Sequence, residues 1–145
     1  MDDGSTYGEA TPGEAWDVLS ADRKAVLVDV RSAPEWTFVG LPDLSSLGRD
    51  VIRVEWQSYP AMQVDAGFVG RLDGALRAAG ADRDSPVYFL CRSGARSAAA
   101  ASAMAGAGYR RCFNVVGGFE GQRDANGHRG TVDGWKADDL PWIQS

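Results

Sequence analysis

The sequence is poor in the residues from which metal sites and disulfide frameworks are built. Its 145 residues include two cysteines, Cys91 and Cys112, and one histidine, His128. The cysteines lie far apart without CxxC spacing, which argues against a disulfide framework and against a thiolate metal site. A lone histidine without clustered acids is a poor metal site, so we expect no bound metal and a surface loop around His128.

Long apolar runs and an excess of positive charge are missing as well. No apolar run approaches the roughly 20 residues that cross a bilayer, so we expect no membrane partner. The opening residues, MDDGSTYGEA, are acidic and polar, unlike a signal peptide. Acidic residues outnumber basic ones by 20 to 15, and the net charge of −5 argues against a nucleic-acid partner. These features favour a cytoplasmic protein whose cysteines stay reduced.

The chain does contain several short apolar runs that are typical of buried strands. Three of them, at 25–30, 86–91 and 112–116, are rich in β-branched and aromatic residues, and 50–56 is a further candidate. Helical patterns separate these runs. Such an alternation predicts an α/β fold with a central, mostly parallel sheet and helices on both of its faces.

Helix boundaries are indicated by capping residues. Thr11 is a typical N-cap, and Glu14 stands where the capping-box partner belongs. We expect Asp65 to cap a second helix that runs to about Ala79, because apolar residues recur there on one face. An alanine-rich segment, 95–107, predicts a third helix.

The segment CRSGARS, residues 91–97, joins a predicted strand to a predicted helix. The first turn of a helix carries unpaired N–H groups and the positive end of the helix dipole. Gly94 lets the backbone curl so that several N–H groups point inward, and Arg92 and Arg96 add positive charge. Such a setting stabilises a thiolate, the nucleophilic form of cysteine. A plain core cysteine at Cys91 is the alternative, but it leaves the arginines and the glycine without a reason.

Three motifs together resemble the rhodanese-type sulfurtransferases. CRSGARS resembles the active-site loop of that family, VLVDVRSAPEW (26–36) its early Asp-x-Arg segment, and NVVGGFEG (114–121) its late Gly-Gly segment. The motifs occur in the family's order. One departure is FVGLPDL (38–44), where many members carry a histidine that is missing here, which leaves the subgroup and the partner open.

The resemblance implies a rhodanese-like fold and a single domain over residues 1–145. Its core is expected at about 8–121, with a C-terminal loop and tail, 122–145, packed on it. The loop at 122–134 is unusual for this family; it either shapes the acceptor side of the site or wraps the surface. Cys112 is expected to be a buried core residue rather than a resolving thiol.

The resemblance also implies a set of residue roles and no cofactor. Cys91 is the nucleophile and carries the sulfur as a persulfide. Arg92 meets an anionic donor at the mouth, while Arg96 turns back to brace the loop, and a buried pair between Asp29 and Arg96 is left open. Ser93 and Ser97 can alternatively do no more than cap the helix. The expected anion-binding loop consists of Arg92, Ser93, Gly94, Ala95, Arg96 and Ser97, with Asp29 and Arg31 in support.

The length of the loop separates two chemistries. Related phosphatases and arsenate reductases have one more residue between cysteine and arginine, which makes room for a tetrahedral oxyanion. The six residues from Cys91 to Arg96 therefore favour sulfur, with thiosulfate as a donor and cyanide or a thiol as the acceptor. A persulfide carrier that serves a sulfur-relay protein is the alternative from a different class.

Overall fold

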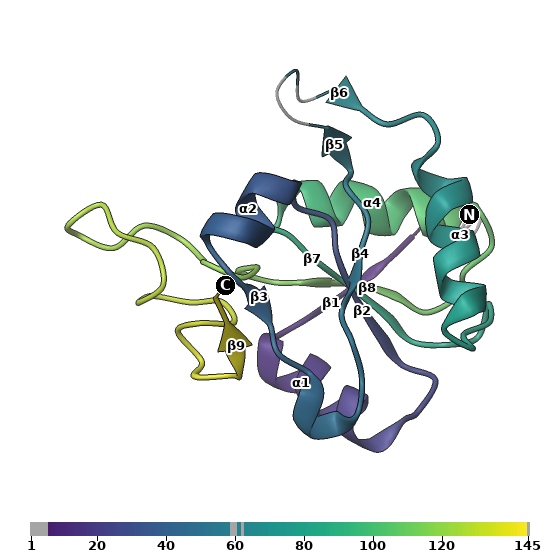
Figure 1. Ribbon diagram of the computed structural model, residues 1–145, viewed down its shortest axis with the longest axis horizontal. Helices are drawn as coiled ribbons and strands as arrows, with labels where there is room; N and C mark the ends of the chain where they lie inside the picture. Colours follow the sequence, from purple (N-terminus) through teal and green to yellow (C-terminus); the bar gives the residue numbers. More distant parts are fainter. Residues whose placement is uncertain (1–5, 59–60, 62, 145) are drawn as a thin grey trace.

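The structure, a computed structural model, describes residues 6–58, 61 and 63–144 (Figure 1). Its centre is a five-stranded parallel sheet in the order β1-β8-β7-β2-β4. The strands are β1 (Gly8–Ala10), β2 (Val26–Asp29), β4 (Ile52–Arg53), β7 (Val87–Leu90) and β8 (Cys112–Val115). The predicted parallel α/β sheet is confirmed. Because all five strands run in one direction, their carboxyl ends share one edge, which is where ligands bind in such sheets.

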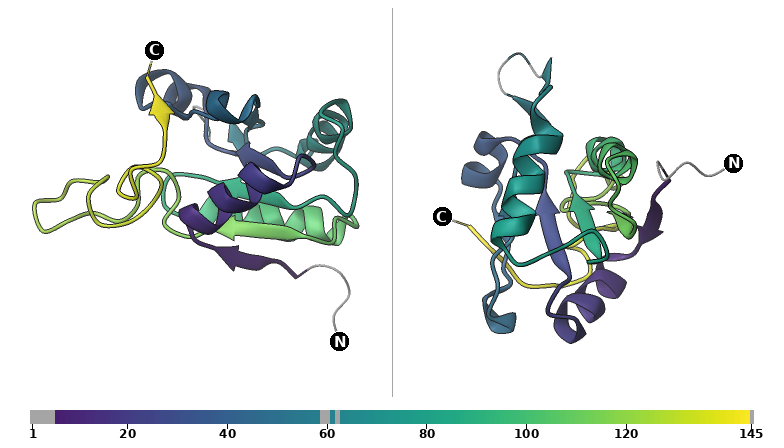
Figure 2. Two further views of the ribbon diagram at one scale, coloured as in Figure 1. Left: turned by 90° about the horizontal axis from the view of Figure 1, so that it is seen from below. Right: turned by 90° about the vertical axis from the view of Figure 1, so that its right-hand side faces the viewer.

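Helices cover both faces of the sheet, as the sequence predicts. They are α1 (Pro12–Ala21), α2 (Ala33–Phe38), α3 (Phe68–Ala78) and α4 (Ala95–Gly106). Figure 2 shows α3 and α4 on one side of the sheet and α1 on the other.

Alternation along the strands explains this division into layers. In β2, Val28 packs with the apolar faces of α3 and α4, whereas its neighbour Leu27 packs with α1. In β7, Phe89 packs with α3 and α4, and its neighbour Tyr88 packs with α1. The strands are therefore buried on both faces and read as continuous apolar runs.

The capping box predicted for the first helix is confirmed. The Thr11 hydroxyl accepts the N–H of Glu14 at 3.1 Å, and the Glu14 carboxylate accepts the N–H of Thr11 at 2.8 Å. The predicted cap at Asp65 is wrong by two residues, because α3 begins after Gly67. Asp65 instead forms the turn before the helix, where its carboxylate accepts the N–H of Gly67 at 2.9 Å.

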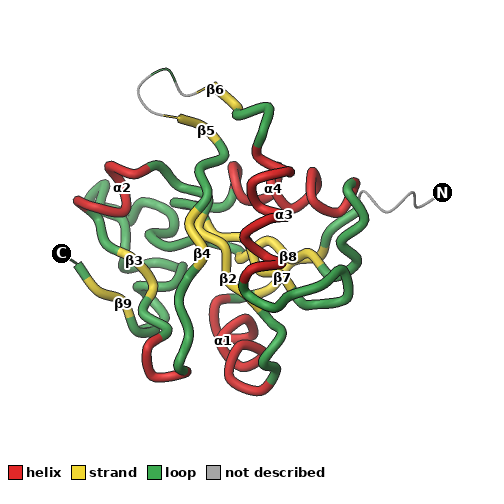
Figure 3. The backbone as a smooth tube through the Cα atoms, turned by 45° about the vertical axis from the view of Figure 1, so that its right-hand side comes forward, coloured by secondary structure: helices red, strands yellow, loops and turns green. Residues whose placement is uncertain are grey.

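Several short elements were not predicted. β3 (Leu41–Pro42) pairs antiparallel with β9 (Trp142–Ile143), which ties the C-terminal tail to the segment after α2. A ribbon of β5 (Gln57–Ser58) and β6 (Gln63–Val64) projects beyond the sheet (Figure 3), and a 3₁₀ turn, η1, spans Ser45–Leu47. None of the helices in the described part of the chain combines the length and the hydropathy of a membrane span.

Candidate active site

Cys91 follows the last residue of β7 and is only 2% exposed. Its Sγ accepts the backbone N–H of Gly94 at 3.1 Å, so the loop curls around the sulfur. Gly94 has φ of 123°, a conformation that L side chains rarely adopt, and α4 begins directly after it at Ala95. The sulfur therefore lies at the N-terminus of a 12-residue helix, where an anion is favoured.

Behind the sulfur runs a chain of polar side chains that sequence reasoning found only in part. Ser97 Oγ lies 3.2 Å from Cys91 Sγ and 2.6 Å from Asn114 Oδ1. Asn114 Nδ2 donates to the Glu9 carboxylate at 3.0 Å. Ser97 is fully buried and is not the helix N-cap, so the interpretation of Ser97 as a simple cap is wrong. Asn114 was detectable as the polar residue in an otherwise apolar strand.

Arg96 braces the loop through Glu35, a residue that we did not single out. Its guanidinium donates to both carboxylate oxygens of Glu35, at 2.7 and 2.9 Å. The Glu35 carboxylate also accepts the N–H and the hydroxyl of Ser32, which forms the capping box of α2. The suggested Asp29–Arg96 pair is therefore wrong, whereas the backward turn of Arg96 agrees with expectation.

The protonation of Glu35 follows from these contacts. Burial pushes the pKa of Glu35 upward, but the hydrogen bonds from Arg96 and Ser32 outweigh it and lower that pKa to about 2. The same ion pair raises the pKa of Arg96. Glu35 is thus an anion throughout the neutral range, and it holds the guanidinium of Arg96 on the α2 side of the loop.

Asp29 pairs with Arg31 instead, and both side chains are fully buried. The Arg31 guanidinium donates to Asp29 at 2.7 Å and to the Gly40 carbonyl at 2.7 Å, and it lies 4.4 Å from the Phe119 ring centroid. Arg31 therefore joins the end of β2 to the segment between α2 and β3 and to the segment that follows β8. This geometry supports bracing for both residues.

The Gly-Gly segment lies directly against the backbone of the cysteine loop. The N–H of Phe119 donates to the carbonyl of Cys91 at 2.8 Å, and the N–H groups of Glu120 and Gly121 donate to the carbonyl of Arg92. At Gly118, a Cβ atom would lie 2.5 Å from the Cys91 carbonyl oxygen. Only glycine allows so close an approach, which explains the glycine in the third motif.

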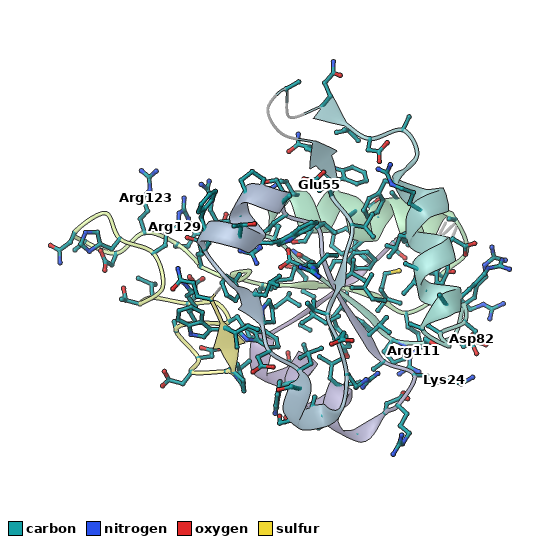
Figure 4. The ribbon with its side chains drawn as sticks, in the orientation of Figure 1. Lys24, Glu55, Asp82, Arg111, Arg123 and Arg129 are labelled. Carbon is teal, nitrogen blue, oxygen red and sulfur yellow. The ribbon has the colours of Figure 1, made fainter. Side chains whose placement is uncertain are left out.

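A hollow of about 540 Å³ opens beside the loop at the carboxyl edge of the sheet. Its walls come from the segments that follow β2, β4, β7 and β8, including Ser32, Gln57 and Glu120. Arg92 is exposed and lines the hollow, as its predicted place at the mouth requires. The 122–134 loop adds Arg129, and Figure 4 shows Arg123 and Arg129 projecting from that loop beside α2.

The remaining candidates lie where the sequence placed them. Cys112 is 3% exposed, and burial raises the pKa of its thiol to about 12, which makes it a poor nucleophile. Both cysteines are free. His128 lies in an exposed loop, and within the part of the chain that the structure describes, no cluster of His, Cys, Asp or Glu is arranged to hold a metal ion.

Comparison with known proteins agrees with this fold. The family model of the STR4 middle domain matches residues 7–145. The chain therefore belongs to the STR4 middle-domain family. It is a rhodanese-like protein, as the three sequence motifs predict.

Three relatives show how far the similarity extends. The crystal structure of Rv0390 from M. tuberculosis shares 48% identity and a TM-score of 0.85, covering 97% of this chain and 100% of that one. The Rickettsia prowazekii protein RP600 is 34% identical over 129 residues, 89% of this chain and 91% of the relative. The thiosulfate sulfurtransferase GlpE of Actinobacillus succinogenes is 30% identical over 119 residues, 82% of this chain and 86% of the relative.

Proposed function

We propose that this protein is a sulfurtransferase that moves sulfane sulfur through a persulfide on Cys91. The observation that carries the proposal is the position of Cys91 Sγ, which accepts the N–H of Gly94 at 3.1 Å inside the six-residue loop that ends at Arg96. A preorganised amide at this place stabilises anionic sulfur at little cost in reorganisation. The name of the GlpE relative supports thiosulfate as a donor.

In the first step, the Cys91 thiolate attacks the outer sulfur of thiosulfate. A bond forms between Cys91 Sγ and that sulfur, the S–S bond of thiosulfate breaks, and sulfite leaves with the electron pair. The product is a persulfide whose outer sulfur carries the negative charge. Exposed Arg92 would attract the anionic donor, and we expect the N–H of Gly94, together with other N–H groups of the loop, to stabilise the new anion.

In the second step, an acceptor nucleophile such as cyanide or a thiolate attacks the outer sulfur. The persulfide S–S bond breaks, and the electron pair returns to Cys91 as a thiolate, which is ready for another donor. Neither step needs an external oxidant or reductant. Asp29, Arg31 and the Glu35–Arg96 pair support the loop from behind and take no part in bond making.

The test compares Cys91→Ser with Cys112→Ser. We expect Cys91→Ser to lower thiosulfate:cyanide transfer by roughly 10³-fold or more, because a serine hydroxyl is not ionised near neutral pH. Cys112→Ser should keep most of the activity, because Cys112 is buried in the core. The measurements are steady-state kinetics and mass spectrometry of the sulfur adduct on Cys91.

Two other results would change the proposal. If Cys112→Ser were inactive and Cys91→Ser active, the nucleophile would be Cys112 and not Cys91. Stoichiometric loading of Cys91 without turnover, for any small acceptor, would favour the persulfide carrier that serves a partner protein.

A further inference from the structure

The charges of the side chains that line the hollow beside the Cys91–Arg96 loop do not balance. Its charged lining consists of Glu35, Arg92, Arg96, Glu120 and Arg129. Glu35 and Arg96 neutralise one another in the bidentate pair described above. Arg92 and Arg129 then outnumber the one remaining acid, Glu120, so the lining has an excess of positive charge in a chain whose net charge is −5.

Arg92 and Arg129 are both hydrogen-bonded to the backbone of Gly121. The N–H of Gly121 donates to the carbonyl of Arg92 at 3.1 Å, and the carbonyl of Gly121 accepts from Arg129 Nη1 at 2.6 Å. A Cβ atom on Gly121 would lie within 2.4 Å of the Asp133 backbone and side chain, so this spacing depends on glycine. Arg129 is half-buried and anchored, and its guanidinium makes no further hydrogen bond or ion pair to the described residues, so its other N–H groups can meet a ligand in the hollow.

We infer that Arg129 is a specificity-determining residue that binds a carboxylate on the acceptor thiol. The inference rests on the proposed function and names the class of its second substrate: a small thiol that carries a carboxylate some bonds away from its sulfur. Arg92 follows Cys91 in the chain, so its guanidinium can bind negative charge next to the reacting sulfur. Arg129 comes from the 122–134 loop, on the other side of Gly121, so its guanidinium can bind negative charge at the far end of the ligand.

The size of the hollow agrees with this class. A volume of about 540 Å³ lies within the range for small-molecule sites and leaves room for a thiol of peptide size. A guanidinium binds a carboxylate through two parallel N–H bonds, which fixes orientation as well as charge. Cyanide and neutral thiols have no carboxylate for the Arg129 guanidinium to bind.

The matched control is Arg123, which lies in the same loop but does not line the hollow. Wild type, Arg129→Ala, Arg129→Lys and Arg123→Ala would be loaded with thiosulfate and freed of excess donor. The loaded proteins would then react with 3-mercaptopropionate or with 2-mercaptoethanol. We expect Arg129→Ala to raise the 3-mercaptopropionate concentration that gives half the maximal rate of persulfide loss roughly three- to ten-fold, and to leave the corresponding concentration of 2-mercaptoethanol unchanged.

The same variants should be distinguishable by their salt dependence. Arg129→Lys should recover most of the effect, since it keeps the charge, and added salt should weaken the wild-type preference for 3-mercaptopropionate. Arg123→Ala should behave as wild type. An equal effect of Arg123→Ala and Arg129→Ala would overturn the inference. Equal losses of rate with both thiols would also overturn it, because they would show that Arg129 only supports the loop.

A second readout does not depend on sulfur transfer. Alkylation of Cys91 by iodoacetate, an anion, is compared with alkylation by neutral iodoacetamide, with Cys91 followed by peptide mapping. Arg129→Ala should lower the ratio of the two rates about three-fold or more, while Arg123→Ala leaves it unchanged. A lowered ratio in a protein that never forms a persulfide would reject the proposed function but support the anion site. An unchanged ratio would overturn the inference even in an active enzyme.

Discussion

At the scale of single residues, the site depends on atoms that are absent as much as on those that are present. Gly118 has φ of 63°, and a Cβ there would lie within 2.7 Å of the backbone of Cys91 and Arg92. Because Gly118 has no side chain, the Gly-Gly segment can approach the cysteine loop and donate its N–H groups to the carbonyls of Cys91 and Arg92. The structure thus places a strict steric requirement directly against the backbone of the cysteine loop.

We expect Gly118→Ala to displace the loop and to reduce sulfur transfer severely, with a loss of stability of about 1–3 kcal/mol from overpacking and backbone strain. Gly74→Ala is the control, since Gly74 lies in the exposed interior of α3 with no atom near its would-be Cβ. That variant should gain roughly 0.5–1 kcal/mol. Urea unfolding and transfer kinetics on both proteins provide the measurement, and equal activity of the two variants would contradict the expectation.

Glu35 predicts a dependence of stability on pH. Because its pKa in the folded protein is lowered to about 2 from the ordinary 4.5, its ion pair stabilises the fold fully above about pH 4.5. This contribution is lost as the pH falls from 4.5 towards 2. Glu35→Gln should therefore be less stable than wild type at pH 7, and the difference in unfolding free energy should narrow in acid. A difference that stays constant from pH 7 to pH 3 would show that the charge of Glu35 is unimportant.

Much of the site was predictable residue by residue, and what was missed has a common cause. The positions of Cys91, Gly94 and Arg96 follow from the local chemistry of a loop before a helix. Glu35 and Glu9 were missed because their partners lie 61 and 105 residues away, and spacing along the chain carries no signal at such separations.

At the scale of elements, the four-residue strands were predicted from their apolar sequence, whereas several two-residue strands were not. β7 and β8 lie within the predicted ranges because buried parallel strands need continuous apolar sequence. β3 and β9 have two residues each and exist only because the tail folds back against the segment after α2. Their pairing depends on tertiary contacts, which a local pattern does not contain.

The six-residue loop predicts which chemistry the wild type excludes. Inserting a glycine between Gly94 and Ala95 should enlarge the loop and turn the Gly94 N–H away from Cys91 Sγ. Sulfur transfer should then fall by roughly 10²- to 10³-fold, as expected for the loss of one preorganised donor. Paired assays of thiosulfate:cyanide transfer and aryl-phosphate hydrolysis test this. Strong phosphatase turnover by the wild type, without sulfur transfer from any donor, would reject the sulfurtransferase proposal.

At the scale of the whole molecule, the C-terminal segment is joined to the core through Trp135. Its side chain is fully buried, its Nε1 donates to the Pro141 carbonyl at 2.7 Å, and its ring meets that of Trp16 edge to face. Trp142, in contrast, is 39% exposed. Trp135 is therefore a large side chain that the tail contributes to the main core, and Leu140 packs against the same cluster.

Trp135→Ala should cost about 3–5 kcal/mol, as for other large-to-small changes in a core. Trp142→Ala should cost much less, because a good part of its surface is already in water. Urea unfolding followed by far-UV circular dichroism gives both values. If residues 1–145 act as one domain, each variant will unfold in a single transition. A separate early transition in Trp135→Ala would instead make the tail an independent unit.

The position of β1 at the edge of the sheet bears on how the protein assembles during translation. β1 pairs with β8, whose residues are synthesised about a hundred residues later, so the first strand leaves the ribosome long before its partner exists. The hydrogen bond from Asn114 to Glu9 likewise cannot form until Asn114 has been synthesised. A nascent chain that ends before β8 exposes an unpaired edge on β7 and lacks the polar support behind Cys91. The support behind Cys91 is therefore completed only when strands from near the two ends of the chain have paired.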